Sequence, residues 1–186
     1  FDASLVTNPQ TTLHRVYRYG AQAGSLSVQV SPVAPEVRVG SKQVISFGDE
    51  RVVLNINFVT EITRTGLFQL SFPLPVGLEV ESLTGEALHH WSELSENGKR
   101  QIVLHLKGKT MGAQKFSLTL AGAVTSDATE WAVPRFELNE STRQSGDLVV
   151  QPITGIRLRT VTRQNISEAD PRSLGAQAQG SLAFRL

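Results

Sequence analysis

The chain has 186 residues, of which 40% are hydrophobic and 19% are charged, so it can bury a hydrophobic core and is not expected to be disordered. The formal net charge is +1 and no more than two basic residues are adjacent, which argues against a nucleic-acid or anionic membrane partner. No apolar run approaches the roughly 20 residues that a membrane-spanning helix needs. We therefore expect no membrane insertion.

Cysteine is absent, which removes disulfides, thiolate metal sites and cysteine nucleophiles together. The chain is rich in serine, threonine and glutamine, a composition that fits a bacterial periplasm or cell surface, although a reducing cytosol stays open. The sequence begins with Phe1 and stops at Leu186 inside an alternation that includes Leu182 and Phe184. We expect an extracytoplasmic bacterial fragment of a longer chain, truncated at its C-terminus.

The clearest strand signal near the start is the alternation of Leu26, Val28 and Val30 with polar residues. Successive residues of a strand point to opposite faces, so this pattern predicts a half-buried strand. Prolines follow it and end the pairing. Other short strands are expected over residues 13–19, 37–39 and 43–47.

Between Glu50 and Leu74, apolar side chains occupy every second position in two successive runs. The first run predicts the longest strand, residues 50–62, and the second predicts a strand over residues 68–74. The intervening Arg64-Thr65-Gly66 predicts a hairpin turn between them.

The alternation returns at residues 102–106 and 116–120, which predicts a second hairpin across the glycines of residues 108–112. Residues 85–98 are the least strand-like stretch and end in a turn at Glu96-Asn97-Gly98. Further strands are expected over residues 130–133, 135–138, 147–150 and 155–161. Residues 162–180 read as a long connection, with a helical turn at residues 167–170.

Many short strands with glycine, proline and Asn-Gly turns predict an all-β protein, an antiparallel β-sandwich built as one large or two small sandwiches. A β-barrel is the alternative. The composition changes after Gly122, and no lysine occurs beyond Lys115. We therefore expect one sandwich over residues 1–122, with residues 123–186 adding strands to it or forming a second sub-domain.

The run from Phe68 through Pro73-Leu74-Pro75 and Gly77 to Val80 resembles the F-PLP-G-x-x-V segment of VIT-type domains, the β-rich modules first described in inter-alpha-trypsin inhibitor heavy chains. It is also similar to segments of bacterial surface proteins. The resemblance covers residues 50–90 and implies a protein-interaction module without catalysis.

The cluster His89-His90-Trp91 is the main candidate for a ligand site. Adjacent strand residues point to opposite faces, so two neighbouring imidazoles are not expected to hold one metal ion, and we predict no metal and no cofactor. Sugars stack on exposed aromatic rings. Trp91, between His90 and Ser92, is expected to be accessible, whereas Trp131 is expected in the core.

Arg157 and Arg159 share one face of an expected strand, where guanidinium groups suit carboxylates or phosphates, or cross-strand pairs with Glu137 or Asp147. Two pairs of acidic residues, Glu79 with Glu81 on one face of a strand and Glu93 with Glu96 in a turn, are candidates for the two carboxylates of glycoside hydrolysis. The ordinary reading of such carboxylates is a solvated strand face. No Gly-x-Ser-x-Gly elbow is present, and we predict no catalytic residues.

These observations favour a non-catalytic β-sandwich module of a larger extracytoplasmic bacterial protein, with a structural, adhesion or protein-interaction role. The alternative is a carbohydrate-binding module, or an accessory or catalytic domain of a glycoside hydrolase. The expected partner is a protein or polysaccharide at the cell surface. The candidate ligand-binding residues are His89, His90, Trp91, Arg157 and Arg159.

Overall fold

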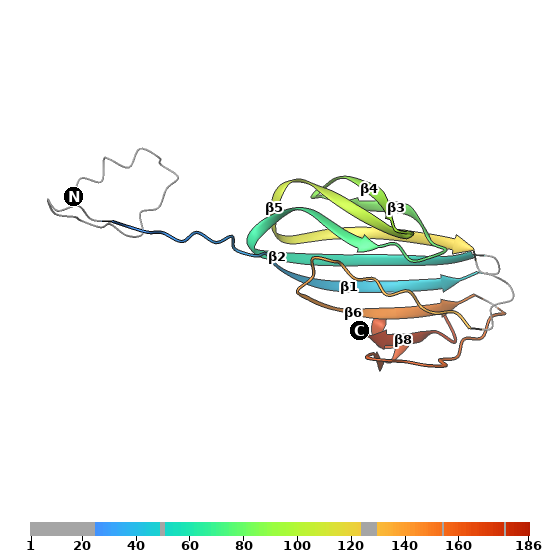
Figure 1. The fold of residues 1–186 in the computed structure, drawn as a ribbon. Coiled ribbons are helices and arrows are strands. Elements are labelled where there is room, and N and C mark those ends of the chain that lie inside the picture. The colour runs from blue at the N-terminus through green and yellow to red at the C-terminus, as the bar shows by residue number, and fades with distance from the viewer. Residues whose placement is uncertain (1–24, 49–50, 124–129, 154, 177) are drawn as a thin grey trace. The chain divides into compact units, whose positions relative to one another are not determined.

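The computed structural model describes residues 25–48, 51–123, 130–153, 155–176 and 178–186, and residues 33–186 form one compact unit. Within these ranges the regular elements are strands, with one short 3₁₀ turn, η2 (Figure 1). This confirms the all-β prediction. The elements are β1 (Glu36–Phe47), β2 (Arg51–Pro73), β3 (Glu79–Gly85), β4 (Leu88–Glu96), β5 (Lys99–Ala123), β6 (Arg143–Pro152), β7 (Ser167–Glu168), η2 (Pro171–Leu174) and β8 (Leu182–Arg185).

The strands form a single sheet in the order β3-β5-β2-β1-β6-β8-β7, and β4 adds to β5. Every pair is antiparallel except β1 with β6, which run parallel. The order ends at β3 and β7 without joining them, so the sheet is open and the barrel alternative is wrong. Because β6 pairs with β1, strands on both sides of Gly122 belong to one sheet.

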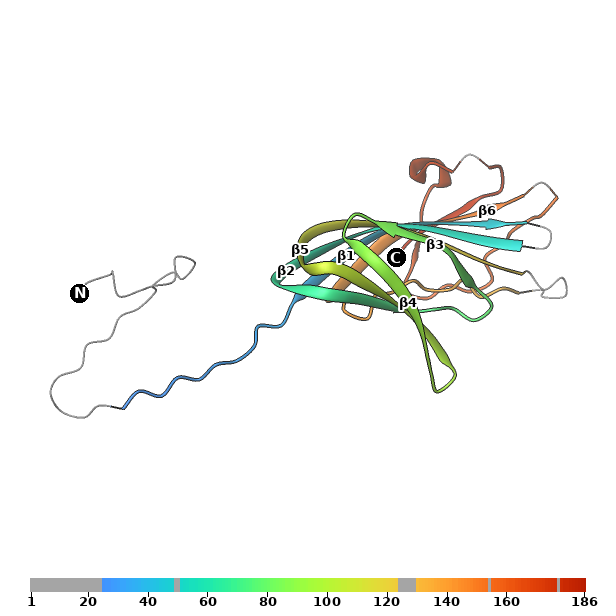
Figure 2. The ribbon, with the colours of Figure 1, turned by 90° about the horizontal axis from the view of Figure 1, so that it is seen from above.

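Strands β2 and β5 are both long, and they bend at the same place. Residues 51–62 of β2 pair with residues 112–123 of β5, and residues 69–73 pair with residues 101–105. Register shifts lie between these two paired stretches, where Arg64 and Gly112 have positive φ angles of 68° and 76°. The bend carries the second half of the ribbon, with β4 attached, over the first half, which makes the sheet sandwich-like (Figures 1 and 2).

The two predicted hairpins, at residues 64–66 and 108–112, are therefore wrong. Each pair of apolar runs belongs to one continuous strand, and its partner is the other long strand. Alternation fixes which side chains face the core, but it does not distinguish a bend from a turn. The separation of β1 into two strands at Gly40 is wrong for the same reason, since residues 36–47 are continuous.

The core follows the predicted alternation. Odd-numbered residues of β1 face inward, and so do even-numbered residues between 52 and 62 of β2, as in the buried Leu54, Ile56 and Phe58. Phe68 departs from the alternation and is 63% exposed, because it lies at the bend. Phe136 packs against rings from both halves of β2, with centroids 4.9 Å from Phe58 and 5.3 Å from Phe72. The two halves of the bent ribbon thus share one core.

Phe136 and Leu138 are buried, but the strand predicted over residues 135–138 is absent. Their backbone groups bond to a side chain instead of a neighbouring strand. The amide of Gln144 donates to the carbonyl of Phe136 at 2.5 Å and accepts from the backbone N–H of Leu138 at 3.1 Å. Nearby, the Glu140 carboxylate accepts from the backbone N–H and the hydroxyl of Ser71.

Other local expectations also differ from the structure. Residues 25–31 carry no strand, and the expected strand 13–19 beyond the intervening turn lies outside the described residues. Residues 85–98, read as irregular, contain strand β4. The expected strands over 130–133 and 155–161 are absent. The helical turn predicted at 167–170 is wrong in position: Ser167–Glu168 form β7, and the turn is η2, which begins at Pro171 and is capped by Asp170, whose side chain accepts from the N–H of Arg172.

Candidate functional site

A shallow groove crosses the outer face of the sheet, on the side away from the core. It has a hollow of about 730 Å³, which adjoins another of about 410 Å³. The register places Ser145 of β6, Gly40 of β1 and Val59 of β2 side by side along its floor. Lys115 of β5 lies opposite Val59 at one end. All four residues are exposed.

Charged and polar side chains form the two rims of this groove. Along one rim, the register places Arg143, Arg38 and Glu61 next to one another on three neighbouring strands. Along the other rim, it places Asp147, Lys42 and Asn57 next to one another. Both signs of charge therefore border a floor whose central residues, Ser145, Gly40 and Val59, have small or short side chains.

Gly40 gives the groove its depth. A Cβ placed on Gly40 would meet no atom within 4 Å, so neither packing nor a positive φ requires glycine at this position. Glycine inside a strand weakens it, and often marks a place where a ligand or another backbone approaches closely. From the sequence, Gly40 was read as a break between two short strands. The only sign that it lies inside one strand is the apolar alternation, which continues unbroken on both sides of it.

The predicted cluster His89-His90-Trp91 lies on β4, and His90 is paired with His105 of β5. A register shift between Leu88 and His90 makes His89 an extra residue, so the two adjacent rings lie together instead of on opposite faces. Their Nδ1 atoms are 2.6 Å apart. The expectation that the side chains of His89 and His90 point to opposite faces is therefore wrong.

The His90 and His105 rings are stacked with centroids 4.3 Å apart and planes 11° apart, and Nε2 of His105 lies 2.9 Å from the Ser92 hydroxyl. Ring nitrogens coordinate a metal in the ring plane, so two parallel stacked rings do not converge on one ion. Across the residues with a defined position, no group of three ligating side chains has a geometry that holds a metal ion.

The prediction for the two tryptophans, an accessible Trp91 and a Trp131 in the core, holds only in part. Trp91 is 37% exposed and lies opposite Leu104, so its ring is on the core-facing side of β4 and only partly accessible. Trp131 is half-buried and packs edge-on against Phe47, with ring centroids 5.0 Å apart.

Arg157 and Arg159 are exposed on a segment without a strand, and they lie on a different element from the histidines. Their suggested partners are bound elsewhere. Glu137 pairs with Arg135 at 3.2 Å and Asp147 lies 4.0 Å from Arg185. The structure therefore does not bring the five candidate residues into one site.

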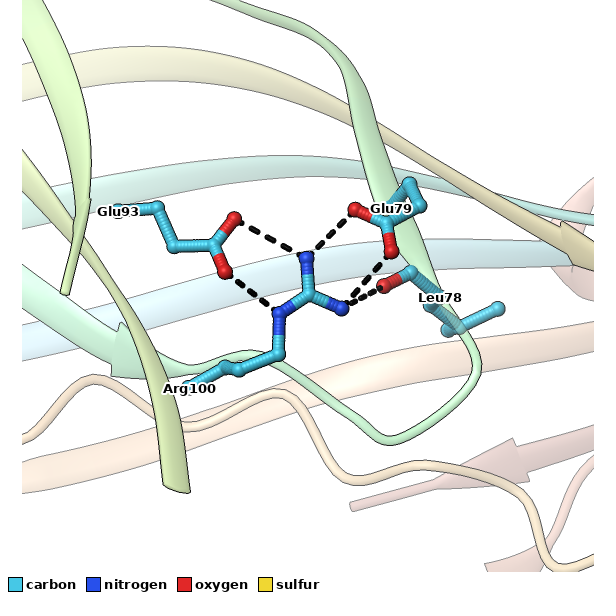
Figure 3. Close-up of polar contacts among 4 residues, drawn as sticks. All are labelled: Leu78, Glu79, Glu93 and Arg100. Carbon is cyan, nitrogen blue, oxygen red and sulfur yellow. Dashed lines mark hydrogen bonds and ion pairs between the residues drawn. The ribbon is translucent and has the colours of Figure 1, made fainter. Parts of the chain in front are cut away.

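Three of the four carboxylates considered for glycoside hydrolysis, Glu79, Glu81 and Glu93, form ion pairs. Arg100 donates to both oxygens of Glu93, at 2.5 and 3.0 Å, and of Glu79, at 2.5 and 2.8 Å (Figure 3). Hydrogen bonds from this guanidinium lower the pKa of Glu79 and of Glu93, and in turn raise the pKa of Arg100. Glu81 pairs with Arg51. The Arg100 group joins β3, β4 and β5 and keeps both carboxylates ionised.

No protein-family model and no curated protein matches the chain. An M1 zinc metallopeptidase from Deinococcus radiodurans is similar in structure at 10% identity and a TM-score of 0.41, over 82% of this chain and 38% of the metallopeptidase chain. A non-cellulosomal cohesin from the archaeon Archaeoglobus fulgidus is similar at 12% identity and a TM-score of 0.34, over 63% of this chain and 91% of the cohesin chain. This chain thus spans well under half of the metallopeptidase's length, and likenesses this distant carry no argument about function.

Among the residues that have a described position, no helix is long and apolar enough to cross a membrane.

Proposed function

We propose that the chain is a non-catalytic β-sandwich module that binds a protein partner, and that its groove takes up an extended polypeptide segment. The observation that carries the proposal is the empty space above Gly40, at a position where a side chain would fit without strain. Selection for folding alone favours β-branched or aromatic residues inside strands. A ligand that approaches the backbone closely gives glycine a reason to be there.

The size and chemistry of the groove favour a peptide. Its floor crosses four strands from Ser145 to Lys115, about 14 Å at a strand spacing of 4.7–4.9 Å, which is the length of about four extended residues. Its rims offer charges of both signs and the Asn57 amide, which suit backbone groups and mixed side chains. The only aromatic residues that line the groove, Phe58 and Phe116, are buried in the core, so the groove offers no exposed aromatic ring to a sugar.

A phage-displayed random peptide library tests the proposal. We expect the wild-type protein to enrich a set of related peptides, and Gly40→Phe to lose their binding because the phenyl ring fills the groove. Gly108→Phe is the matched control, since a Cβ at Gly108, on β5 and outside the groove, also meets no atom within 4 Å. Circular dichroism and thermal unfolding establish that each variant is folded.

Two outcomes would overturn the proposal. One is a wild-type protein that enriches no peptide, and the other is enriched peptides that bind Gly40→Phe as tightly as wild type. A glycan array examines the alternative: sugar binding that is lost in Trp91→Ala and kept in Gly40→Phe would make the chain a carbohydrate-binding module. We further propose an extracytoplasmic bacterial location, which is supported by the cysteine-free composition alone.

A further inference from the structure

Three of the chain's four histidines meet where β4 joins β5. His90 is the central member. Its ring stacks on His105, with centroids 4.3 Å apart, and lies edge-on to His89, with centroids 4.9 Å apart. The bulge at His89 makes this contact possible, because it removes the strict alternation that would send His89 and His90 to opposite faces. The cluster takes no part in the groove on the sheet face.

The surroundings of the cluster provide little compensation for positive charge. On β5, Lys107 follows His105 on the same face, and on β2 the register places the neutral Gln69 opposite His105. On β4, Ser92 contacts His105. Glu93 lies on the opposite face of β4 from Ser92 and is bound by Arg100. Glu140 is bound to Ser71, which is the register partner of Val103. Glu86 precedes β4, and no histidine forms an ion pair with a carboxylate in the described part of the chain.

A second proton in the cluster would therefore place like charges in contact. Partial desolvation of the exposed His90 ring lowers its pKa below the usual value of 6.5, and the neighbouring His105 and His89 lower it further. A group with a lowered pKa in the folded state favours folding while it is neutral. That contribution is present above about pH 6.5 and is lost as the pH falls through the folded-state value.

The position of the histidine cluster decides which part of the fold is affected by its protonation. Strand β4 pairs with β5 along one edge and has no strand on its other edge in the described residues. Its second half is fastened by the Glu93–Arg100 ion pair and by the short connection to β5 after Glu96. The first half, residues 88–92, carries the histidines and the bulge. Charge repulsion acts on this half alone.

We propose that the contact of His89, His90 and His105 makes the first half of β4 acid-sensitive, so that it separates from β5 when the surroundings acidify. At neutral pH the stacked, uncharged rings hold the edge of the sheet together. In acid, protonated rings repel one another and residues 88–92 release the free edge of β5. The site is thus a local pH-dependent latch, independent of what the groove binds.

Amide hydrogen exchange followed by NMR tests this. We expect protection factors of the β4 amides in residues 88–92 to fall at least tenfold between pH 7.5 and pH 5.0, relative to those in residues 94–96. In His90→Gln this fall should largely disappear, because the central ring can no longer charge. His14→Gln is the control for the loss of a histidine as such, since the cluster is made of the sequence's other three histidines, and it should respond to pH as wild type does.

The latch is refuted if protection of residues 88–92 does not change with pH in the wild type, or if it falls equally in His90→Gln. Should His90→Gln fail to fold, the wild-type imidazole titration by NMR decides the matter. A pKa of His90 at or above 6.5 overturns the proposal, and a lower one supports it.

Discussion

The Cβ that Gly146 lacks would lie 2.3 Å from the hydroxyl oxygen of Ser41 and 2.5 Å from its carbonyl oxygen. The two residues are register partners across the parallel pair of β1 and β6, and both lie on the inner face of the sheet. Glycine is therefore required here by a close approach of two strands. Gly40, one residue away from Ser41, is under no such constraint.

This difference predicts opposite outcomes for two similar substitutions. Gly146→Ala forces β6 away from β1, and we expect it to lower the free energy of unfolding by about 1–3 kcal/mol, as overpacking does. Gly40→Ala should be neutral or should raise it by roughly 0.5–1 kcal/mol, because alanine is preferred to glycine inside a strand. Urea unfolding of both variants measures the effect. Equal stabilities of the two variants would contradict it.

Which faces of the strands are buried could be predicted from sequence, and where the chain turns could not. The alternation through Leu54, Ile56 and Phe58 correctly identified the inner face of β2. It did not reveal that β2 continues past Arg64, because a bent strand and a hairpin leave the same apolar pattern on both sides of the break. The partner of each half is set by contacts distant in the chain, which no local pattern records.

The burial of Phe136 predicts how much stability is lost when its ring is removed, although its segment has no regular secondary structure. It is 5% exposed and contacts Phe58 and Phe72, which lie on the two halves of the bent β2. We expect Phe136→Ala to lower the free energy of unfolding by about 3–5 kcal/mol, the range for buried phenylalanine.

The control for this prediction is Val133→Ala on the same segment. Val133 is 43% exposed, so its truncation should change stability by less than about 0.5 kcal/mol. Chemical unfolding measures both variants. A Phe136→Ala protein as stable as Val133→Ala would show that the segment does not complete the core.

The ion pairs of Arg100 with Glu79 and Glu93 predict that the stability of the protein depends on pH. Its hydrogen bonds lower the pKa of both Glu79 and Glu93, so their contribution to stability is present above the usual glutamate pKa and is lost as the pH falls through the lowered values. Arg100→Met should be less stable than wild type at pH 7. It should also lose less stability between pH 5 and pH 3, because its carboxylates titrate near their usual range.

Urea unfolding at pH 7, 5 and 3 measures this dependence. Arg157→Met serves as the control, since Arg157 is exposed and forms no ion pair with the described residues. It should follow the wild-type pH profile. If Arg100→Met loses as much stability in acid as wild type, the two carboxylates do not depend on Arg100.

The candidate sites show a similar division between what sequence reveals and what it hides. The cluster of His89 and His90 was visible in the sequence, but its third member, His105, is joined only through the pairing of β4 with β5. The groove was not visible, because its floor of Ser145, Gly40 and Val59 comes from three strands and depends on their register. Periodicity identifies an outer face and says nothing about which outer residues become neighbours.

The turn at Asn97 and Gly98 was read correctly from the sequence, and it gives the last prediction. These two residues connect β4 to β5, and both have positive φ angles, of 51° and 74°. This is the backbone geometry of a two-residue type I′ hairpin turn, which favours Asn-Gly. A Cβ at Gly98 would meet no atom within 4 Å, so the cost of a side chain there is purely conformational.

Gly98→Ala should therefore lower the free energy of unfolding by roughly 1–2 kcal/mol, the cost of the left-handed conformation for a residue with a side chain. Asn97→Gly should have little effect, since glycine adopts the same φ without strain. Thermal unfolding compares the two variants, and circular dichroism shows whether strand content is kept. If Gly98→Ala has the same melting temperature as wild type, the prediction is wrong. The pairing of Glu96 with Lys99 would then hold without a left-handed glycine between them, and the β4–β5 connection would tolerate another turn type.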